Sequence, residues 1–197
     1  LWVAFSVESK MPLAFHLDSG NIADTVYFKR CVSRAGYVLG PGVMKRVVAD
    51  RGFCSRELYL WLERVMHLKF VFRAKGGQTN AYIQDAVNAL ERKDFRCLGS
   101  NTRYAKVDVT GFKEQWLRLF VGRHCGFQKD FLLITNDPLL EYRGIRRIYL
   151  KRWTVESFFH DQKGTFLLGK FCCTRWQAVF AEVTCSLLAC ILLKVFS

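Results

Sequence analysis

The sequence predicts an α/β fold, in which a sheet of buried strands is flanked by helices. Residues 44–50 form a short core strand that ends on Asp50, a helical segment follows Ser55, and residues 69–73 form a second core strand. This order of strand, helix and strand is typical of parallel pairing. A further core strand is expected at residues 131–135. With 197 residues, 51% of them hydrophobic, the chain can bury a core of its own.

The amino-terminal segment is predicted to form a hairpin followed by a helix. Two apolar stretches, Leu1–Val7 and Leu13–Leu17, lie on either side of a polar turn. The helix is expected to be capped by Asn21, with the carboxylate of Asp24 near its first exposed amides. Gly36 is expected to follow its last turn.

The segment of about residues 75–129 has weaker signals and is interpreted as a β-rich insertion. A helix is expected around Ala81–Glu91, and strands are expected at Tyr104–Val109 and Trp116–Val121. The chain is therefore interpreted as one partial domain, with a core of about residues 1–74 and 130–175, the insertion, and a carboxyl-terminal helix of about residues 176–196.

Two further helices are predicted near the carboxyl terminus. Residues Asn136–Pro138 offer a cap and a first turn for a long helix. The apolar run Ala178–Val195 is long enough to raise the question of a membrane span, but Glu182 interrupts it and Lys194 lies at its end. A buried final helix is therefore expected, and no membrane partner.

The composition favours a reduced protein that meets nucleic acid. Thirty Lys and Arg residues against seventeen Asp and Glu give a net charge of +13, which attracts polyanions. The eight cysteines contain no Cys-x-x-Cys pair, and the sequence does not begin with a signal-peptide pattern. A reduced, cytoplasmic protein is therefore expected. Cys185 and Cys190 lie in the final apolar run, where free cysteine usually packs as a small core residue.

Known motifs for several other chemistries are absent from the sequence. It has no Gly-rich phosphate loop followed by Lys-Ser or Lys-Thr, no Gly-x-Ser-x-Gly and no His-Glu-x-x-His. Nucleotide hydrolysis, serine-ester hydrolysis and zinc proteolysis therefore lack support.

Four polar residues of the predicted long helix have a distinctive spacing. Tyr149 is followed by Arg152, Glu156 and Lys163, at offsets of three, seven and fourteen residues. At 100° per residue, the last three lie about −60°, −20° and −40° from the first, and the set spans about 21 Å along the axis. In one continuous helix all four would share a narrow face that points to solvent, a partner or an ion. Residues 141–175 carry eight Lys or Arg against three acids, so this helix lies in a basic region.

Each candidate residue also has a simpler structural explanation. Asp at the end of a strand, as at position 50, is most often a turn or cap residue. Glu156 lies four residues after Arg152 and suits an intrahelical ion pair of a few tenths of a kcal/mol. Lys163 suits a solvated position near a helix end.

The sequence resembles a known family at these positions. The pattern of Tyr149, Arg152, Glu156 and Lys163 is the YREK signature of insertion-sequence transposases of the insertion-sequence-four family. A second family motif, Asp, one residue, Gly and an aromatic residue, matches from Asp50 to Phe53. The resemblance extends from the hairpin to the final helix and is weakest between residues 75 and 129.

The resemblance implies a ribonuclease-H-like fold that carries a DDE triad for two divalent metal ions, Mg²⁺ or Mn²⁺. By the motifs, Asp50 is the second aspartate and Glu156 the glutamate, both catalytic and metal-binding. Tyr149, Arg152 and Lys163 would bind phosphates of the transposon end. The complete enzyme would cleave terminal inverted repeats and transfer 3′ hydroxyl strands to target DNA, as a homodimer in a nucleoid-associated setting.

The sequence departs from the family at its amino terminus. The first triad aspartate is expected on a strand that precedes the hairpin, whereas Asp18 and Asp24 follow it. We therefore expect an amino-terminally truncated catalytic domain that lacks one metal ligand and cannot catalyse transposition alone. Two alternatives remain: a non-catalytic DNA-binding or assembly-poisoning remnant, and another nuclease of the same broad fold.

Overall fold

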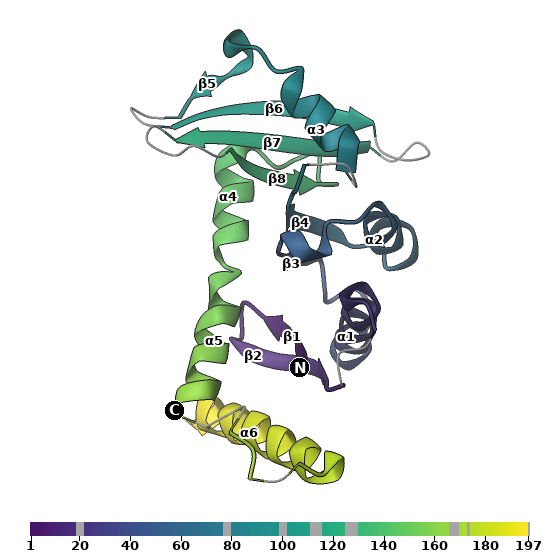
Figure 1. Cartoon of the computed structure of the whole chain (residues 1–197), viewed down its shortest axis with the longest axis vertical. Coiled ribbons are helices and arrows are strands. Elements are labelled where there is room, and N and C mark those ends of the chain that lie inside the picture. The colour runs from purple at the N-terminus through teal and green to yellow at the C-terminus, as the bar shows by residue number, and fades with distance from the viewer. Residues whose placement is uncertain are drawn as a thin grey trace. The chain divides into compact units, whose positions relative to one another are not determined.

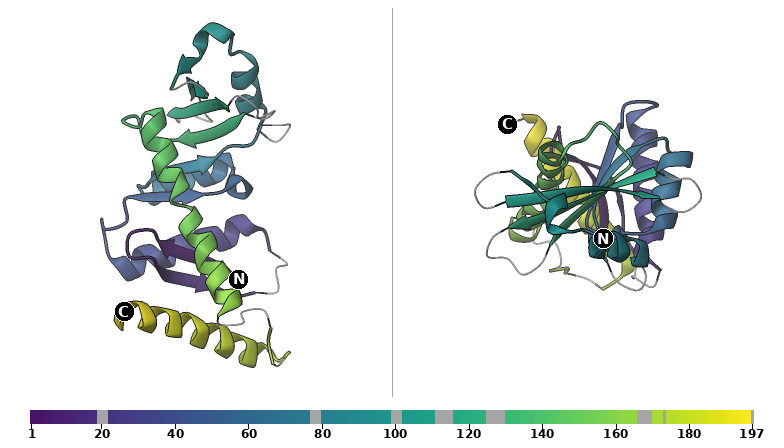
Figure 2. Two further views of the ribbon diagram at one scale, coloured as in Figure 1. Left: turned by 90° about the vertical axis from the view of Figure 1, so that its left-hand side faces the viewer. Right: turned by 90° about the horizontal axis from the view of Figure 1, so that it is seen from above.

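The protein forms two compact units. The computed structural model describes residues 1–18, 22–76, 80–98, 102–110, 116–124, 130–165, 170–172 and 174–196. One unit combines residues 1–41 and 151–197, and the other contains residues 42–150 (Figures 1 and 2). Each unit is described by itself below.

The unit of residues 42–150 is built on a mixed six-stranded sheet with the order β3-β4-β8-β7-β6-β5. β3 and β4 are parallel, and every other neighbouring pair is antiparallel. The predicted strands at 69–73 and 131–135 are confirmed with those bounds, and the one at 44–50 is confirmed in a shorter form. The strands are β3 (Arg46–Ala49), β4 (Lys69–Arg73), β5 (Arg96–Cys97), β6 (Thr102–Thr110), β7 (Trp116–His124) and β8 (Phe131–Thr135).

β4 lies inside the sheet, between β3 and β8. Its residues Phe70, Val71 and Phe72 are fully buried, although they point alternately to the two faces of the sheet. A strand covered on both faces has a continuous apolar sequence rather than an alternating one, which explains the Phe-Val-Phe run.

Helices cover both faces of this sheet. On one face, Tyr59 of α2 (Arg56–Leu60) stacks on Phe70 with ring centroids 4.9 Å apart. On the other, α4 (Tyr142–Leu150) buries Tyr142, Ile145 and Tyr149 against residues of β4, β7 and β8. The sequence-predicted mixed sheet flanked by helices is therefore observed.

The helix predicted after Ser55 changes character along its length. α2 passes at Trp61 into a π-helical turn, η2 (Trp61–Val65), which is followed by β4. Ser55 occupies the position before the first helical residue, but its side chain makes no capping hydrogen bond. Short 3₁₀ helices in the described part of this unit include η1 (Arg51–Phe53) and η4 (Arg92–Asp94).

The segment of residues 75–129 contains the predicted helix and strands, as α3 (Ala81–Asn88), β6 and β7. β5 was not predicted. β7 pairs directly with β8, with Leu119 opposite Ile134, so these strands extend the same sheet. At Gly122 of β7 the Tyr142 hydroxyl approaches so closely that a Cβ atom would lie 2.1 Å from it, so this position requires glycine.

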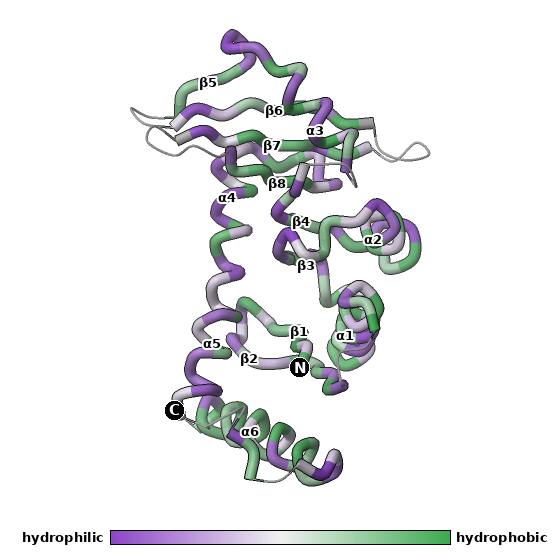
Figure 3. The backbone as a smooth tube through the Cα atoms, in the orientation of Figure 1, coloured by the Kyte–Doolittle hydropathy of each residue, from purple (hydrophilic) through white to green (hydrophobic). Residues whose placement is uncertain are grey.

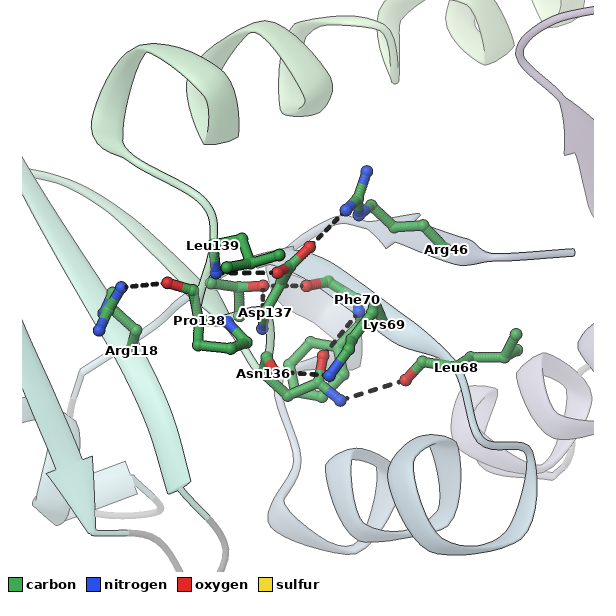
Figure 4. Close-up of polar contacts among 10 residues, drawn as sticks. Arg46, Leu68, Lys69, Phe70, Arg118, Asn136, Asp137, Pro138 and Leu139 are labelled. Atoms are coloured by element: carbon green, nitrogen blue, oxygen red, sulfur yellow. Dashed lines mark hydrogen bonds and ion pairs between the residues drawn. The ribbon is translucent and has the colours of Figure 1, made fainter.

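Asn136 and Asp137 form a polar turn after β8 instead of capping a helix (Figure 4). The amide of Asn136 accepts from the backbone N–H of Phe70 at 2.9 Å and donates to the carbonyl of Leu68 at 3.1 Å. Asp137 accepts from the backbone N–H of Leu139 and forms an ion pair with Arg46 of β3. The prediction that these residues begin the long helix is wrong, because tertiary partners use their side chains and α4 begins only at Tyr142.

The unit of residues 1–41 and 151–197 contains the predicted hairpin, formed by β1 (Trp2–Ser6) and β2 (Met11–His16). α1 (Asp24–Leu39) covers one face, where Trp2 stacks on Tyr27 with ring centroids 3.8 Å apart. The Trp2 indole N–H donates to Asp24 at 3.1 Å, which is a tertiary contact rather than a cap.

Two predicted boundaries of α1 are not observed as expected. Asn21, the predicted cap, lies outside the described residues, and the residue that precedes the helix is Ala23. Gly36 does not end the helix, which continues to Leu39. It ends at Gly40, where a φ of 85° suits glycine.

The other face of the hairpin packs on α5 (Trp153–Gly164) and α6 (Trp176–Phe196). Val183, Leu187 and Cys190 of α6 join Phe158 of α5 in this cluster. The Lys194 ammonium of α6 donates to the Lys10 carbonyl in the hairpin turn at 2.6 Å.

The expectation of a buried final helix is wrong for most of the α6 surface. Only 17% of its most apolar 18-residue window is buried, and Leu188, Leu192 and Val195 are more than half exposed. Figure 3 shows that hydrophobic positions predominate along α6. Cys190 is buried as expected, whereas Cys185 is exposed. By length and composition α6 would suffice to cross a membrane, which for one helix is weak evidence.

We predict that Asn136→Ala destabilises the protein by roughly 2 to 4 kcal/mol, because it leaves the buried Phe70 N–H and Leu68 carbonyl without their partner. Urea unfolding would measure this change. Asn88→Ala is the matched control, since Asn88 is exposed, and should change stability by less than about 0.5 kcal/mol. Equal effects of the two substitutions would contradict a structural role for the Asn136 turn.

Candidate active site

Asp50 lies directly after β3, at the carboxyl end of the parallel strand pair. Its Oδ1 accepts from the backbone N–H of Arg51 at 2.8 Å, and so caps η1. The same oxygen accepts from the Tyr149 hydroxyl of α4 at 3.1 Å. Asp50 thus caps a turn, as its simpler explanation predicted, and also accepts a hydrogen bond from Tyr149, 99 residues later in the chain.

Tyr149 does not face outward, as the helical-face argument predicted. Its ring is 2% exposed and meets Phe131 of β8 edge-on, with centroids 5.6 Å apart. Its hydroxyl donates to Asp50. Two turns earlier, burial raises the pKa of Tyr142, which therefore stays neutral in the same core. Tyr149 is a core residue with a polar end at the site.

The predicted long helix is interrupted inside the motif. α4 ends at Leu150 and α5 begins at Trp153. In the first turn of α5 the backbone N–H groups of Thr154 and Val155 donate to the carbonyls of Lys151 and Arg152, only three residues earlier, which is a 3₁₀-type tightening. The calculation that put all four motif residues on one face assumed an unbroken helix. That assumption does not hold between Tyr149 and Arg152, where the boundary between the two units also falls.

Arg152 and Glu156 form an ion pair in the unit that contains α5. The guanidinium Nη1 lies 2.6 Å from the Glu156 carboxylate, and the two side chains are 17% and 44% exposed. The guanidinium also lies over the Trp153 ring, 5.8 Å from its centroid. Glu156 is thereby held at the surface, where it is accessible to a ligand.

Lys163 lies in the last turn of α5, seven residues after Glu156. Both residues are within one continuous helix, so they share a face about 10.5 Å apart along the axis. Lys163 is exposed.

The structure thus brings the five predicted site residues together in two groups. Asp50 and Tyr149 meet in one unit, and Arg152, Glu156 and Lys163 line α5 in the other. Carboxylate oxygens such as those of Asp50 and Glu156 suit hard divalent cations, so their chemistry fits Mg²⁺ or Mn²⁺. Among the described residues, no cluster of three His, Cys, Asp or Glu side chains is placed to hold a metal ion.

Comparison with known protein families identifies the class. The family described as transposase DDE domain matches residues 1–192 of the chain. The chain therefore belongs to the DDE transposase family, whose members act on DNA and generally use divalent metals. The mixed sheet flanked by helices agrees with the ribonuclease-H-like fold of that family. A comparison with curated proteins gives no match.

We predict that Tyr149→Phe costs about 1 kcal/mol and Tyr149→Ala about 3 to 5 kcal/mol, since the first removes one hydrogen bond and the second also empties part of the core. Chemical denaturation would measure both. Tyr37→Ala is the control because Tyr37 is 88% exposed, and it should have little effect. A small cost for Tyr149→Ala would mean that the ring is not a core residue.

Proposed function

We propose that this chain is a catalytic part of an insertion-sequence transposase of the insertion-sequence-four class. The complete enzyme would cleave terminal inverted repeats and transfer 3′ hydroxyl strands to target DNA. The observation that carries this proposal is the hydrogen bond between the motif residue Tyr149 and Asp50, the carboxylate at the end of β3. It links two sequence motifs that lie far apart in the chain.

In this proposal Asp50 and Glu156 hold divalent metal ions. Two bound ions would activate the attacking hydroxyl and stabilise the leaving oxygen. Tyr149 positions Asp50 through its hydroxyl, while Arg152, just before α5, and Lys163, exposed near its end, meet DNA phosphates. The Arg152–Glu156 pair would then separate or rearrange when Glu156 binds a cation.

The proposal keeps the division into a core of about residues 1–74 and 130–175, an insertion of about 75–129 and a final helix. β3, β4 and β8 are contiguous in the sheet, and β5–β7 lie beyond β8, which supports an addition at that side. We also propose that the protein acts as a homodimer on DNA in the cytoplasm, associated with the nucleoid. Light scattering with and without transposon-end DNA would test the dimer.

Iron-directed cleavage of the polypeptide tests the metal site independently of catalysis. Fe²⁺ bound in place of Mg²⁺, with ascorbate and peroxide, should cut the chain near Asp50 and near Glu156. Asp50→Asn and Glu156→Gln should each remove cuts at both places, because a shared ion needs both carboxylates. Asp130→Asn is the control, since that carboxylate pairs with Arg123. Independent loss of the two cuts would refute a shared site.

DNA nicking provides a second test. The family resemblance implies three carboxylates, whereas only Asp50 and Glu156 are assigned in this chain. We therefore predict that the 197-residue polypeptide does not nick transposon-end DNA with Mg²⁺ or Mn²⁺. Full metal-dependent activity of this polypeptide would contradict that expectation and would require a third ligand within it.

The alternative proposal is a non-catalytic transposase remnant that binds DNA or poisons assembly. The exposed cations of the basic region support it equally well. Iron-directed cleavage separates the two proposals, because a remnant would bind DNA without cuts centred on Asp50 and Glu156.

A further inference from the structure

α4 carries a second polar surface that the motif does not include. Its arginines Arg143, Arg146 and Arg147, which we call the α4 arginine face, lie within about 100° of helix circumference. The buried residues of α4 are centred roughly 120° away, by the same helical geometry. Arg143 and Arg147 are exposed, and Arg146 is partly exposed.

The arginines of this face have no acidic partner among the described residues, in contrast to Arg118 and Arg123 of the same unit. Arg118 pairs with Asp108 at 3.0 Å and Arg123 with Asp130 at 2.9 Å. Within the described part of the chain, no carboxylate forms an ion pair with Arg143, Arg146 or Arg147. The acid just before α4, Glu141, pairs with Lys106 of β6 at 3.1 Å.

An uncompensated group of this kind suits a polyanion. Like charges three and four residues apart on a helix face each other and repel, as Arg143 does with Arg146 and Arg147. Phosphates would relieve this repulsion, and guanidinium groups bind them through paired hydrogen bonds.

We propose that the α4 arginine face binds the phosphate backbone of duplex DNA, at a surface distinct from the Asp50 site. Tyr149, which contacts Asp50, belongs to the buried side of α4, so the two surfaces use different sides of one helix. This inference rests on the proposed function for the identity of the polyanion. The α4 arginine face would contact a different segment of DNA from the one that meets the carboxylates. Because it would contact only the phosphate backbone, this binding would not depend on the DNA sequence.

Fluorescence anisotropy with a labelled duplex of arbitrary sequence, in chelator and at 50 to 200 mM KCl, tests the proposal. The variant is Arg143→Gln with Arg146→Gln and Arg147→Gln. The control is Arg34→Gln with Arg92→Gln and Arg103→Gln, which removes the same charge from exposed positions on other elements. Circular dichroism melting would check that both variants fold.

The slope of the logarithm of the DNA-binding constant against the logarithm of the salt concentration is about −0.9 for each phosphate contact. We therefore expect this slope to be less steep by roughly 2 to 3 in the α4 variant. Its affinity at 100 mM KCl should fall at least tenfold, with less than a threefold fall for the control. Equal losses in the two variants, or wild-type binding by the α4 variant, would overturn the proposal.

The chelator separates this test from that of the metal site. The α4 variant, assayed with Fe²⁺ and without chelator, should keep the iron-directed cuts near Asp50 and Glu156, because its substitutions leave both carboxylates in place. If the α4 variant has the reduced salt slope but the wild-type protein gives no iron-directed cuts, the metal proposal is rejected and the proposal for the α4 arginine face stands. The opposite pattern would reject only the α4 arginine face.

Discussion

The hydrogen bonds of the Asn136 side chain to the backbone on either side of Lys69 are the constraint on which the candidate site depends. They fix the end of β8 beside the start of β4, where the chain must turn back. β3 runs parallel to β4, so Asp50 lies at the far end of this strand pair. α4 therefore crosses the sheet from the Asn136 turn toward Asp50, and Tyr149 near its end reaches that carboxylate.

The strands could be predicted from the sequence because a buried strand requires a continuous run of apolar residues. Residues 69–73 and 131–135 are short apolar runs bounded by polar residues, and both became strands with those bounds. No local sequence pattern indicated the role of Asn136. Asn before Asp-Pro is a common helix cap, and only the fold shows that the backbone near Leu68 and Phe70 competes for its amide.

Two helices show the limit of periodicity as evidence. The sequence around residues 148–155 has no helix breaker, so one long helix was expected. The interruption instead follows the change of packing partners, since Tyr149 belongs to the sheet core and Phe158 to the hairpin core. In α6, apolar residues surround the axis, so the sequence could not indicate that only the side with Val183 and Leu187 is buried.

The sequence motif predicted an arrangement of its residues that the structure does not show. Its helical spacing suggested one polar stripe, yet Tyr149 contributes through a buried ring whose hydroxyl reaches Asp50, whereas Glu156 is held by Arg152 on α5. α4 thus combines, within nine residues, a core face, a polar contact with Asp50 and a group of arginines that have no acidic partner in the described part of the chain. Neighbouring residues of one helix point to different faces. The effect of a substitution in α4 on activity, DNA binding or stability must therefore be interpreted according to the face on which the residue lies.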